Sequence, residues 1–178
     1  MLSWIIVIAA AVVVDQVSKV LVIKFLKDLV SVEIIPGILR FTYVENRGAA
    51  FGMLSDNRWI FMIISTLAIV ALVVYLWKFR PDSILACLAL SMIVGGGIGN
   101  MIDRVALGYV VDFIDFCAFP GLWMWVFNVA DACVCVGAGL LALWLIISMV
   151  QDSKQEKAQK QQAQVAENAA QPEGTEEN

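Results

Sequence analysis

Four long apolar segments, separated by short polar ones, dominate the pattern of residues along the chain. They cover about residues 4–27, 59–77, 83–103 and 128–150, and each approaches the ~20 apolar residues that a helix needs to cross a bilayer. The first segment lacks the basic start and the small-residue cleavage site of a secretory signal peptide, and it is too long for one. The pattern therefore predicts a multi-pass membrane protein with four transmembrane helices.

The polar stretch between the first two segments, about residues 28–58, has the pattern of strands. β-Branched and aromatic residues flank the turn dipeptide Pro36-Gly37, and apolar positions alternate with polar ones from residue 39 to residue 43. We expect a small sheet on the membrane surface here. After the fourth segment, residues 151–178 are rich in Gln, Ala and Glu with little to bury, which predicts a disordered and dispensable tail.

Composition supports a membrane protein and narrows the available chemistry. Of the 178 residues, 61% are hydrophobic and 16% charged, against roughly 25% charged in a soluble domain. The chain has no histidine, which excludes Ser-His-Asp and Cys-His nucleophiles, and its four cysteines lack zinc-site spacing. The net charge of −4 leaves no basic surface for nucleic acid. Any chemistry must therefore come from carboxylates, lysine or serine.

The best candidates are Asp112 and Asp131, two acids on short motifs among valines, phenylalanines and tryptophans. A carboxylate in such surroundings costs several kcal/mol unless it is paired, hydrogen-bonded or protonated. With four spans and short connections, both acids come to the face that also holds the 28–58 loop. The polar residues expected at this face are Asn46, Asn100, Asp103, Arg104, Asp112, Asn128 and Asp131. Positive charge lies in the short turn after the second segment and in the tail, at Lys78, Arg80, Lys154, Lys157 and Lys160. Because positively charged connections tend to stay in the cytoplasm, this favours cytoplasmic termini and places the face with the two acids outside.

Physical reasoning leaves three functions open for this face. Two acids about 3 Å apart share one proton, an arrangement that suits a hydrolase of the aspartic-protease kind. A proton-coupled transporter and a structural scaffold are the alternatives. Asp15, with Lys19 four residues on, is either a structural ion pair or part of the site. The glycines at 95–97 and 99 either allow close helix packing or make room for a substrate.

Five motifs in order resemble the bacterial lipoprotein signal peptidase family, also called signal peptidase II, a family of membrane aspartyl peptidases. The resemblance covers roughly residues 4–150. The motifs are Asp15-Gln16-Val17-Ser18-Lys19, Asn46-Arg47-Gly48-Ala49-Ala50-Phe51-Gly52, Gly95-Gly96-Gly97-Ile98-Gly99-Asn100 running into Asp103-Arg104, Val110-Val111-Asp112-Phe113, and Phe127-Asn128-Val129-Ala130-Asp131. The sequence departs from the family at Ala132, where a small hydroxyl residue is usual.

The resemblance implies an all-α membrane protein, with four transmembrane helices and a small extracytoplasmic β-cradle between the first two. Asp112 and Asp131 match the catalytic pair. The residues that match substrate-binding or supporting positions are Asp15, Asn46, Gly48, Asn100, Asp103, Arg104, Asn128 and Ala130. The enzyme would work without metal or cofactor and remove the signal peptide of a prolipoprotein before its diacylglyceryl-modified cysteine.

The resemblance also implies the surroundings of the enzyme. We expect a monomer in the bacterial inner membrane, in contact with membrane lipids, with a periplasmic active site and both termini cytoplasmic. Peptides of the globomycin type would inhibit it. Trp123 and Trp125, between the two acids, form either a mobile lid over the site or ordinary anchors at the membrane interface.

Overall fold

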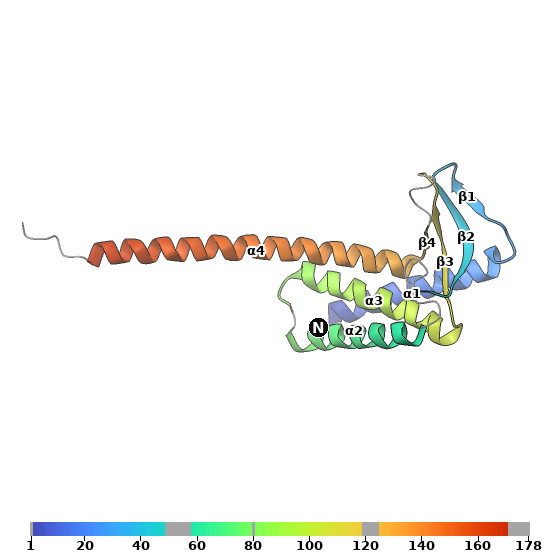
Figure 1. Cartoon of the computed structure of the whole chain (residues 1–178), viewed down its shortest axis with the longest axis horizontal. Coiled ribbons are helices and arrows are strands. Elements are labelled where there is room, and N and C mark those ends of the chain that lie inside the picture. The colour runs from blue at the N-terminus through green and yellow to red at the C-terminus, as the bar shows by residue number, and fades with distance from the viewer. Residues whose placement is uncertain (1, 49–57, 80, 119–124, 171–178) are drawn as a thin grey trace, which may run out of the picture. The chain divides into compact units, whose positions relative to one another are not determined.

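The computed structural model describes residues 2–48, 58–79, 81–118 and 125–170 of the chain (Figure 1). The elements in chain order are α1 (Leu2–Leu26), β1 (Val32–Ile35), β2 (Leu39–Asn46), α2 (Arg58–Phe79), α3 (Ile84–Ala106), β3 (Val110–Phe116), β4 (Val126–Phe127) and α4 (Val129–Ala170). The chain divides into two compact units, Met1–Leu141 and Ala142–Asn178. The first unit contains every element that carries a candidate site residue, including the start of α4.

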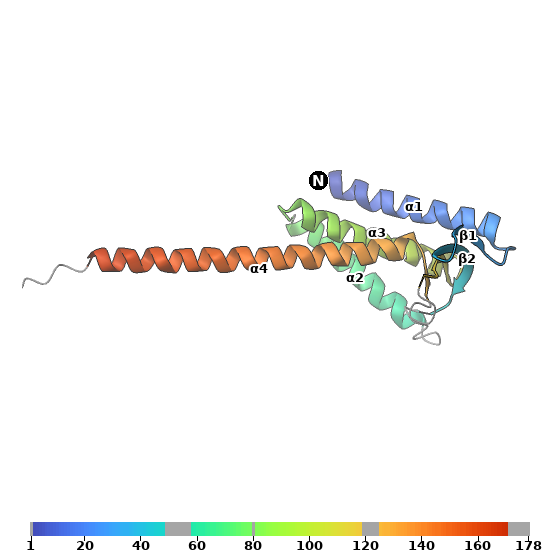
Figure 2. The ribbon, with the colours of Figure 1, turned by 90° about the horizontal axis from the view of Figure 1, so that it is seen from above.

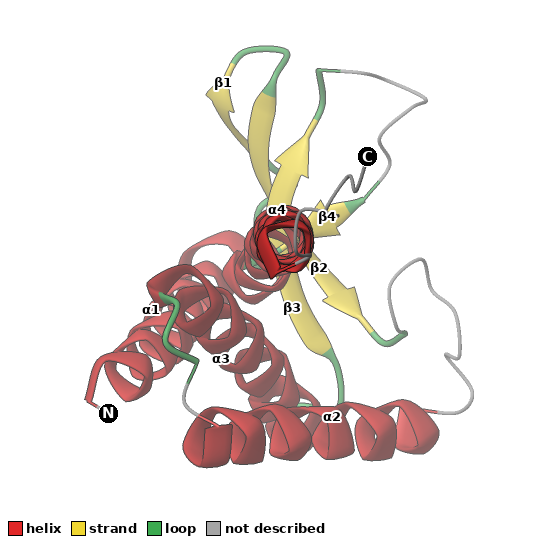
Figure 3. Cartoon of the chain, turned by 90° about the vertical axis from the view of Figure 1, so that its left-hand side faces the viewer, coloured by secondary structure: helices red, strands yellow, loops and turns green. Residues whose placement is uncertain are grey.

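Within the described residues, four helices are long and apolar enough to cross a bilayer, which confirms the predicted number of spans. They are Trp4–Leu26, Met62–Phe79, Ile84–Ala106 and Val129–Gln162. Half of the α3 span is buried inside the protein, against 17% for α1 and 6% for α2. α3 packs against both α1 and α2 and lies between them in Figure 3. It is therefore the central helix of the first unit, and its polar carboxyl-terminal end is surrounded by protein.

The glycine run of α3 brings neighbouring helices into close contact. A Cβ added at Gly95 would lie 2.7 Å from the Ala11 Cβ of α1. At Gly96 a Cβ would overlap the Ala130 carbonyl oxygen at the start of α4. Small residues allow this approach of backbones, which stabilises helix pairs in lipid by van der Waals contact. Of the two interpretations of the glycines, close packing is the one that these contacts support.

The sheet stands at the end of the helices where α1 and α3 finish (Figures 1 and 2). It is antiparallel with the order β1-β2-β3-β4. The predicted hairpin is present as β1 and β2, with Gly37 at a φ of 69° in its turn. The other half of the sheet, β3 and β4, comes from the connection between α3 and α4, whereas the sequence predicted a sheet only between α1 and α2. Residues 110–116 are apolar on both faces of the strand, so alternation does not mark them.

A small apolar core attaches the sheet to the helices. Val22 of α1 and Val111 and Phe113 of β3 are buried together, and Phe41 of β2 packs against them with its ring centroid 5.7 Å from that of Phe113. Burying side chains of this size contributes about 1.5–3 kcal/mol each. Asp112 lies between the two buried β3 residues, so this core also fixes its position.

The helix α4 continues to Ala170, so residues 151–170 are helical where their composition predicts disorder. Alanine, glutamine, glutamate and lysine are good helix formers, and Glu156 pairs with Lys160 one turn later. Low hydrophobicity therefore predicted disorder for residues that form a helix, because it takes no account of their helix propensity. That the tail is dispensable remains a prediction.

Candidate active site

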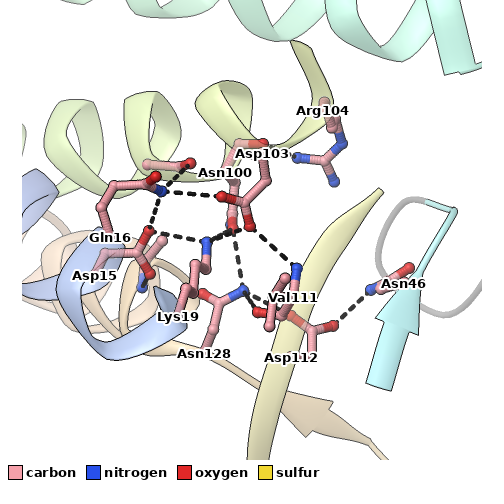
Figure 4. Close-up of polar contacts among 12 residues, drawn as sticks. Asp15, Gln16, Lys19, Asn46, Asn100, Asp103, Arg104, Val111, Asp112 and Asn128 are labelled. Atoms are coloured by element: carbon pink, nitrogen blue, oxygen red, sulfur yellow. Dashed lines mark hydrogen bonds and ion pairs between the residues drawn. The ribbon is translucent and has the colours of Figure 1, made fainter. Parts of the chain in front are cut away.

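The candidate residues come from segments far apart in the chain and meet where α3 ends, β3 passes and α4 begins (Figure 4). Asn46 ends β2, Asp112 lies on β3, and Asp131 lies in the first turn of α4. The convergence predicted from the span count is thus present. The contacts among these side chains decide what each of them can do.

Asp112 is a buried carboxyl held by two amide groups. Its side chain is 2% exposed. Asn46 Nδ2 donates to Asp112 Oδ2 at 2.8 Å, and Asn128 Nδ2 donates to Asp112 Oδ1 at 2.6 Å. Burial, and then the nearby charge of Asp131, raise the pKa of Asp112 from 3.8 to about 7. A carboxyl with this pKa can hold a proton at neutral pH and donate it.

Gly48 fixes the orientation of the amide that holds Asp112. Its backbone N–H donates to Asn46 Oδ1 at 3.1 Å. Because the oxygen of the Asn46 amide is occupied in this way, its Nδ2 faces the Asp112 carboxylate. Gly48 therefore has a supporting role through Asn46.

Asp131 and Asn128 cap the amino-terminal end of α4 with two reciprocal hydrogen bonds. Asn128 Oδ1 accepts the Asp131 backbone N–H at 2.9 Å, and Asp131 Oδ2 accepts the Asn128 backbone N–H at 3.3 Å. This is the arrangement of a capping box, here with asparagine and aspartate. The Asp131 carboxylate accepts a second hydrogen bond at Oδ1, from Asn100 Nδ2 of α3 at 2.7 Å. Local helix capping and one long-range bond together orient the carboxylate.

Asn128 connects the two acids within one side chain. It is fully buried, and its Nδ2 lies 2.6 Å from Asp112 Oδ1, 3.0 Å from Asn100 Oδ1 and 3.3 Å from the Val111 carbonyl oxygen. Its Oδ1 holds the backbone of Asp131. The same amide therefore fixes both carboxylates, a link that the sequence motif does not reveal.

Asp15 and Asp103 each accept a backbone N–H beside one of the two candidate acids. Asp15 Oδ1 accepts the Ala130 N–H at 2.9 Å, and Asp103 Oδ2 accepts the Val111 N–H at 3.0 Å. Ala130 and Asp15 are both completely buried. Each of these acids thus anchors the residue just before one member of the candidate pair.

Arg104 adds positive charge at the end of α3. Its Nη1 donates to the Asn100 carbonyl oxygen at 3.1 Å, and its charge interacts with those of Asp112 and Asp131. It can therefore offset negative charge on the pair while the pair holds a single proton.

Two polar residues of α1 were not predicted as members of the site. Lys19 contacts Asp15 and Asp103 in a buried cluster, and Gln16 Nε2 donates to Asp103 Oδ1 at 3.0 Å and to the Gly99 carbonyl oxygen at 3.1 Å. The spacing of four between Asp15 and Lys19 was the available signal, and it left open whether the two form a structural ion pair or part of the site.

Part of the motif after Asn46, residues 49–52, and Trp123 lie outside the described residues. Trp125 is 40% exposed, and the interpretation of the two tryptophans as a lid stays untested. Among the described residues, no group of three or more His, Cys, Asp or Glu side chains is placed to hold a metal ion.

The fold and the site define a class of protein: a multi-pass membrane protein with two aspartates joined through buried amides. The family described as "Signal peptidase (SPase) II" matches residues 7–147. Proteins named lipoprotein signal peptidase are similar over most of both chains. The one from Caldanaerobacter subterraneus subsp. tengcongensis is 46% identical, covering 80% of this chain and 94% of its own. The one from Clostridioides difficile is 43% identical, covering 80% and 94%.

Two solved structures, each described as a bacterial membrane enzyme, share the fold. One has a TM-score of 0.75 at 35% identity, covering 86% of this chain and 90% of its own. The other has a TM-score of 0.73 at 35% identity, covering 82% and 93%. With the family match, these likenesses establish that the chain belongs to the signal peptidase II family.

Proposed function

We propose that Asp112 and Asp131 are the catalytic pair of an aspartic endopeptidase that removes signal peptides from diacylglyceryl-modified prolipoproteins. Membership of the signal peptidase II family makes the protein a peptide hydrolase of lipoprotein processing. The observation that carries the assignment of the pair is Asn128, which holds a carboxylate oxygen of Asp112 and the backbone of Asp131 at once.

The pair works with one proton between its two members. Asp112, with its pKa raised to about 7, carries that proton and donates a hydrogen bond to the scissile carbonyl oxygen. Asp131 is ionised and takes a proton from a water molecule, whose oxygen forms a bond to the carbonyl carbon. The carbon–nitrogen bond then breaks, and the leaving amine takes a proton from the pair. The amides of Asn46, Asn100 and Asn128 keep both carboxylates oriented through these steps.

The position of the site suits a lipid-anchored substrate. The candidate residues lie where the transmembrane helices meet the sheet, close to the expected depth of the membrane interface. A diacylglyceryl chain stays in the bilayer and would hold the scissile bond beside the pair, which raises its effective concentration. We propose that the site faces the periplasm of the inner membrane, with both termini cytoplasmic, and that the enzyme acts as a monomer open to inhibition by globomycin-type peptides.

A cleavage assay in detergent tests the pair. Wild type, Asp112→Asn and Asp131→Asn are compared on a diacylglyceryl-modified prolipoprotein and on its unmodified precursor, with chelator present. Asp115→Asn is the matched control, because Asp115 lies on the same strand but pairs with the exposed Arg40. We expect cleavage of the modified substrate only, by wild type and the control, and none by the other two variants.

The outcomes separate the alternatives. A fully active Asp131→Asn enzyme contradicts the catalytic pair. If folded wild type cleaves neither substrate, the peptidase proposal fails, and proton uptake into liposomes becomes the next measurement for the transporter alternative. Equal cleavage of both substrates leaves the pair intact and contradicts the requirement for lipid.

A further inference from the structure

Lys19 is a buried cation that the proposed reaction does not use. Its side chain is 2% exposed, inside the transmembrane part of α1. Its Nζ lies 2.8 Å from Asp15 Oδ2, 2.9 Å from Asp103 Oδ2 and 3.0 Å from Asn100 Oδ1. An ammonium group has three N–H donors, and all three have a partner here. Burying a charge this completely is costly unless it is fully paired.

Each partner of Lys19 also forms a hydrogen bond with a member of the catalytic pair or with the residue just before one. Asp15 accepts the backbone N–H of the residue before Asp131, and Asp103 accepts that of the residue before Asp112. Asn100, the third partner, donates to the Asp131 carboxylate itself at 2.7 Å. One ammonium group thus contacts three residues that support the pair, Asp15 of α1 and Asn100 and Asp103 of α3.

Lys19 also decides which way the Asn100 amide points. Asn100 Oδ1 accepts from both Lys19 Nζ and Asn128 Nδ2, each at 3.0 Å. Because two donors hold the oxygen, the nitrogen of this amide is turned to Asp131. Without Lys19, Asn128 alone would hold the Asn100 oxygen in place. The amide could then rotate and turn its oxygen, instead of its nitrogen, toward the Asp131 carboxylate.

We infer that Lys19 is a positioning residue of the peptidase, which fixes the positions of Asp112 and Asp131 relative to each other through Asp15, Asp103 and Asn100. This inference rests on the proposed catalytic pair. Lys19 does not touch the substrate. It ties the strand that carries Asp112 and the helix that carries Asp131 to the same ammonium group, through Asp103 and Asp15. Arginine is a poor substitute, because its planar group cannot direct three donors to acceptors arranged around one nitrogen.

The positive charge of Lys19 has a second consequence for Asp112. The charged groups that act on this carboxyl are Asp131 from α4, Lys19 from α1 and Arg104 from the end of α3, while Asp103 pairs with Lys19. Lys19 lowers the pKa of Asp112 against the larger effects of burial and of Asp131, which raise it. Its removal should therefore move the loss of activity at alkaline pH to higher pH.

The test is Lys19→Met, which keeps most of the chain length and removes the donors and the charge. Since this change leaves two buried acids with one cation fewer, the variant can fail to fold. Lys19→Met combined with Asp15→Asn removes one charge of each sign and keeps an oxygen for the Ala130 N–H. Lys24→Met is the control, because Lys24 lies on the same helix, exposed and outside this cluster.

In the cleavage assay on the diacylglyceryl-modified substrate, we expect the folded double variant to lose about 100-fold in kcat with KM changed less than about twofold. Asp15→Asn alone should be at least about tenfold more active than the double variant, because it keeps Lys19 and its bond to Asn100. The alkaline limb of the kcat/KM profile should move to higher pH in the double variant and stay in place in Lys24→Met.

A folded double variant with wild-type kcat and an unchanged pH profile overturns the inference and leaves Lys19 a structural residue. Asp131→Asn, measured alongside, tells this failure from that of the catalytic pair. An inactive Asp131→Asn with a fully active double variant contradicts only the role of Lys19. An active Asp131→Asn contradicts the pair on which the inference rests.

Discussion

Replacing Asn128 by aspartate tests whether one amide joins the two acids. The change keeps the size and shape of the side chain but exchanges two N–H donors for an oxygen. If ionised, that oxygen would face Asp112 Oδ1 at 2.6 Å, Asn100 Oδ1 at 3.0 Å and the Val111 carbonyl oxygen at 3.3 Å, and would have no hydrogen to donate to them. If protonated, the new carboxyl could supply one hydrogen bond. At least one of the two donors is lost in either form.

The magnitude follows from the lost bonds. A neutral hydrogen bond contributes about 0.5–1.5 kcal/mol and one to a charged group about 1.5–3 kcal/mol. We therefore expect a loss of about 2–3 kcal/mol of transition-state stabilisation, which corresponds to roughly 30- to 150-fold in kcat/KM. Asn46→Asp is the matched comparison, because Asn46 makes a single bond to Asp112. Its kcat/KM should fall by only about 5- to 30-fold, since one donor is lost.

The assay measures cleavage of a diacylglyceryl-modified peptide in mixed micelles, with thermal unfolding of each variant followed in the same detergent. Activity is compared at a temperature where every variant is folded. If Asn128→Asp keeps the wild-type kcat/KM, or loses less activity than Asn46→Asp, the link between the two acids through Asn128 is wrong.

Two further predictions concern pH and helix packing. Because the pKa of Asp112 is raised to about 7 and the reaction needs its proton, kcat/KM should fall about tenfold per pH unit above that value; a profile flat from pH 6 to 9 would contradict this assignment. For packing, a Cβ added at Gly137 would lie 2.7 Å from the Ala89 carbonyl oxygen, whereas nothing lies within 4 Å of one added at Gly139. Gly137→Ala should thus lower the unfolding temperature in detergent and Gly139→Ala should not, a ranking that equal midpoints would refute.

The sequence by itself determined the elements whose signals are local. Runs of apolar residues mark the four membrane helices, and Pro36-Gly37 marks the hairpin of β1 and β2, because both depend on neighbours in the chain. The two acids could also be recognised without a structure, since Asp112 and Asp131 stand in surroundings where a charge is costly. Their motifs then indicated the family.

The tertiary structure decided how these residues act on one another. Lys19 and Asn100 are 81 positions apart, and Asp15 and Ala130 are 115 apart. No periodicity within one segment encodes such contacts, which arise only when the glycines of α3 let α1 and α4 approach. β3 was missed for a related reason: its residues are apolar on both faces because helices and strands from elsewhere cover them. The sequence identified the two carboxylates, and long-range packing decided which amides and which cation hold them.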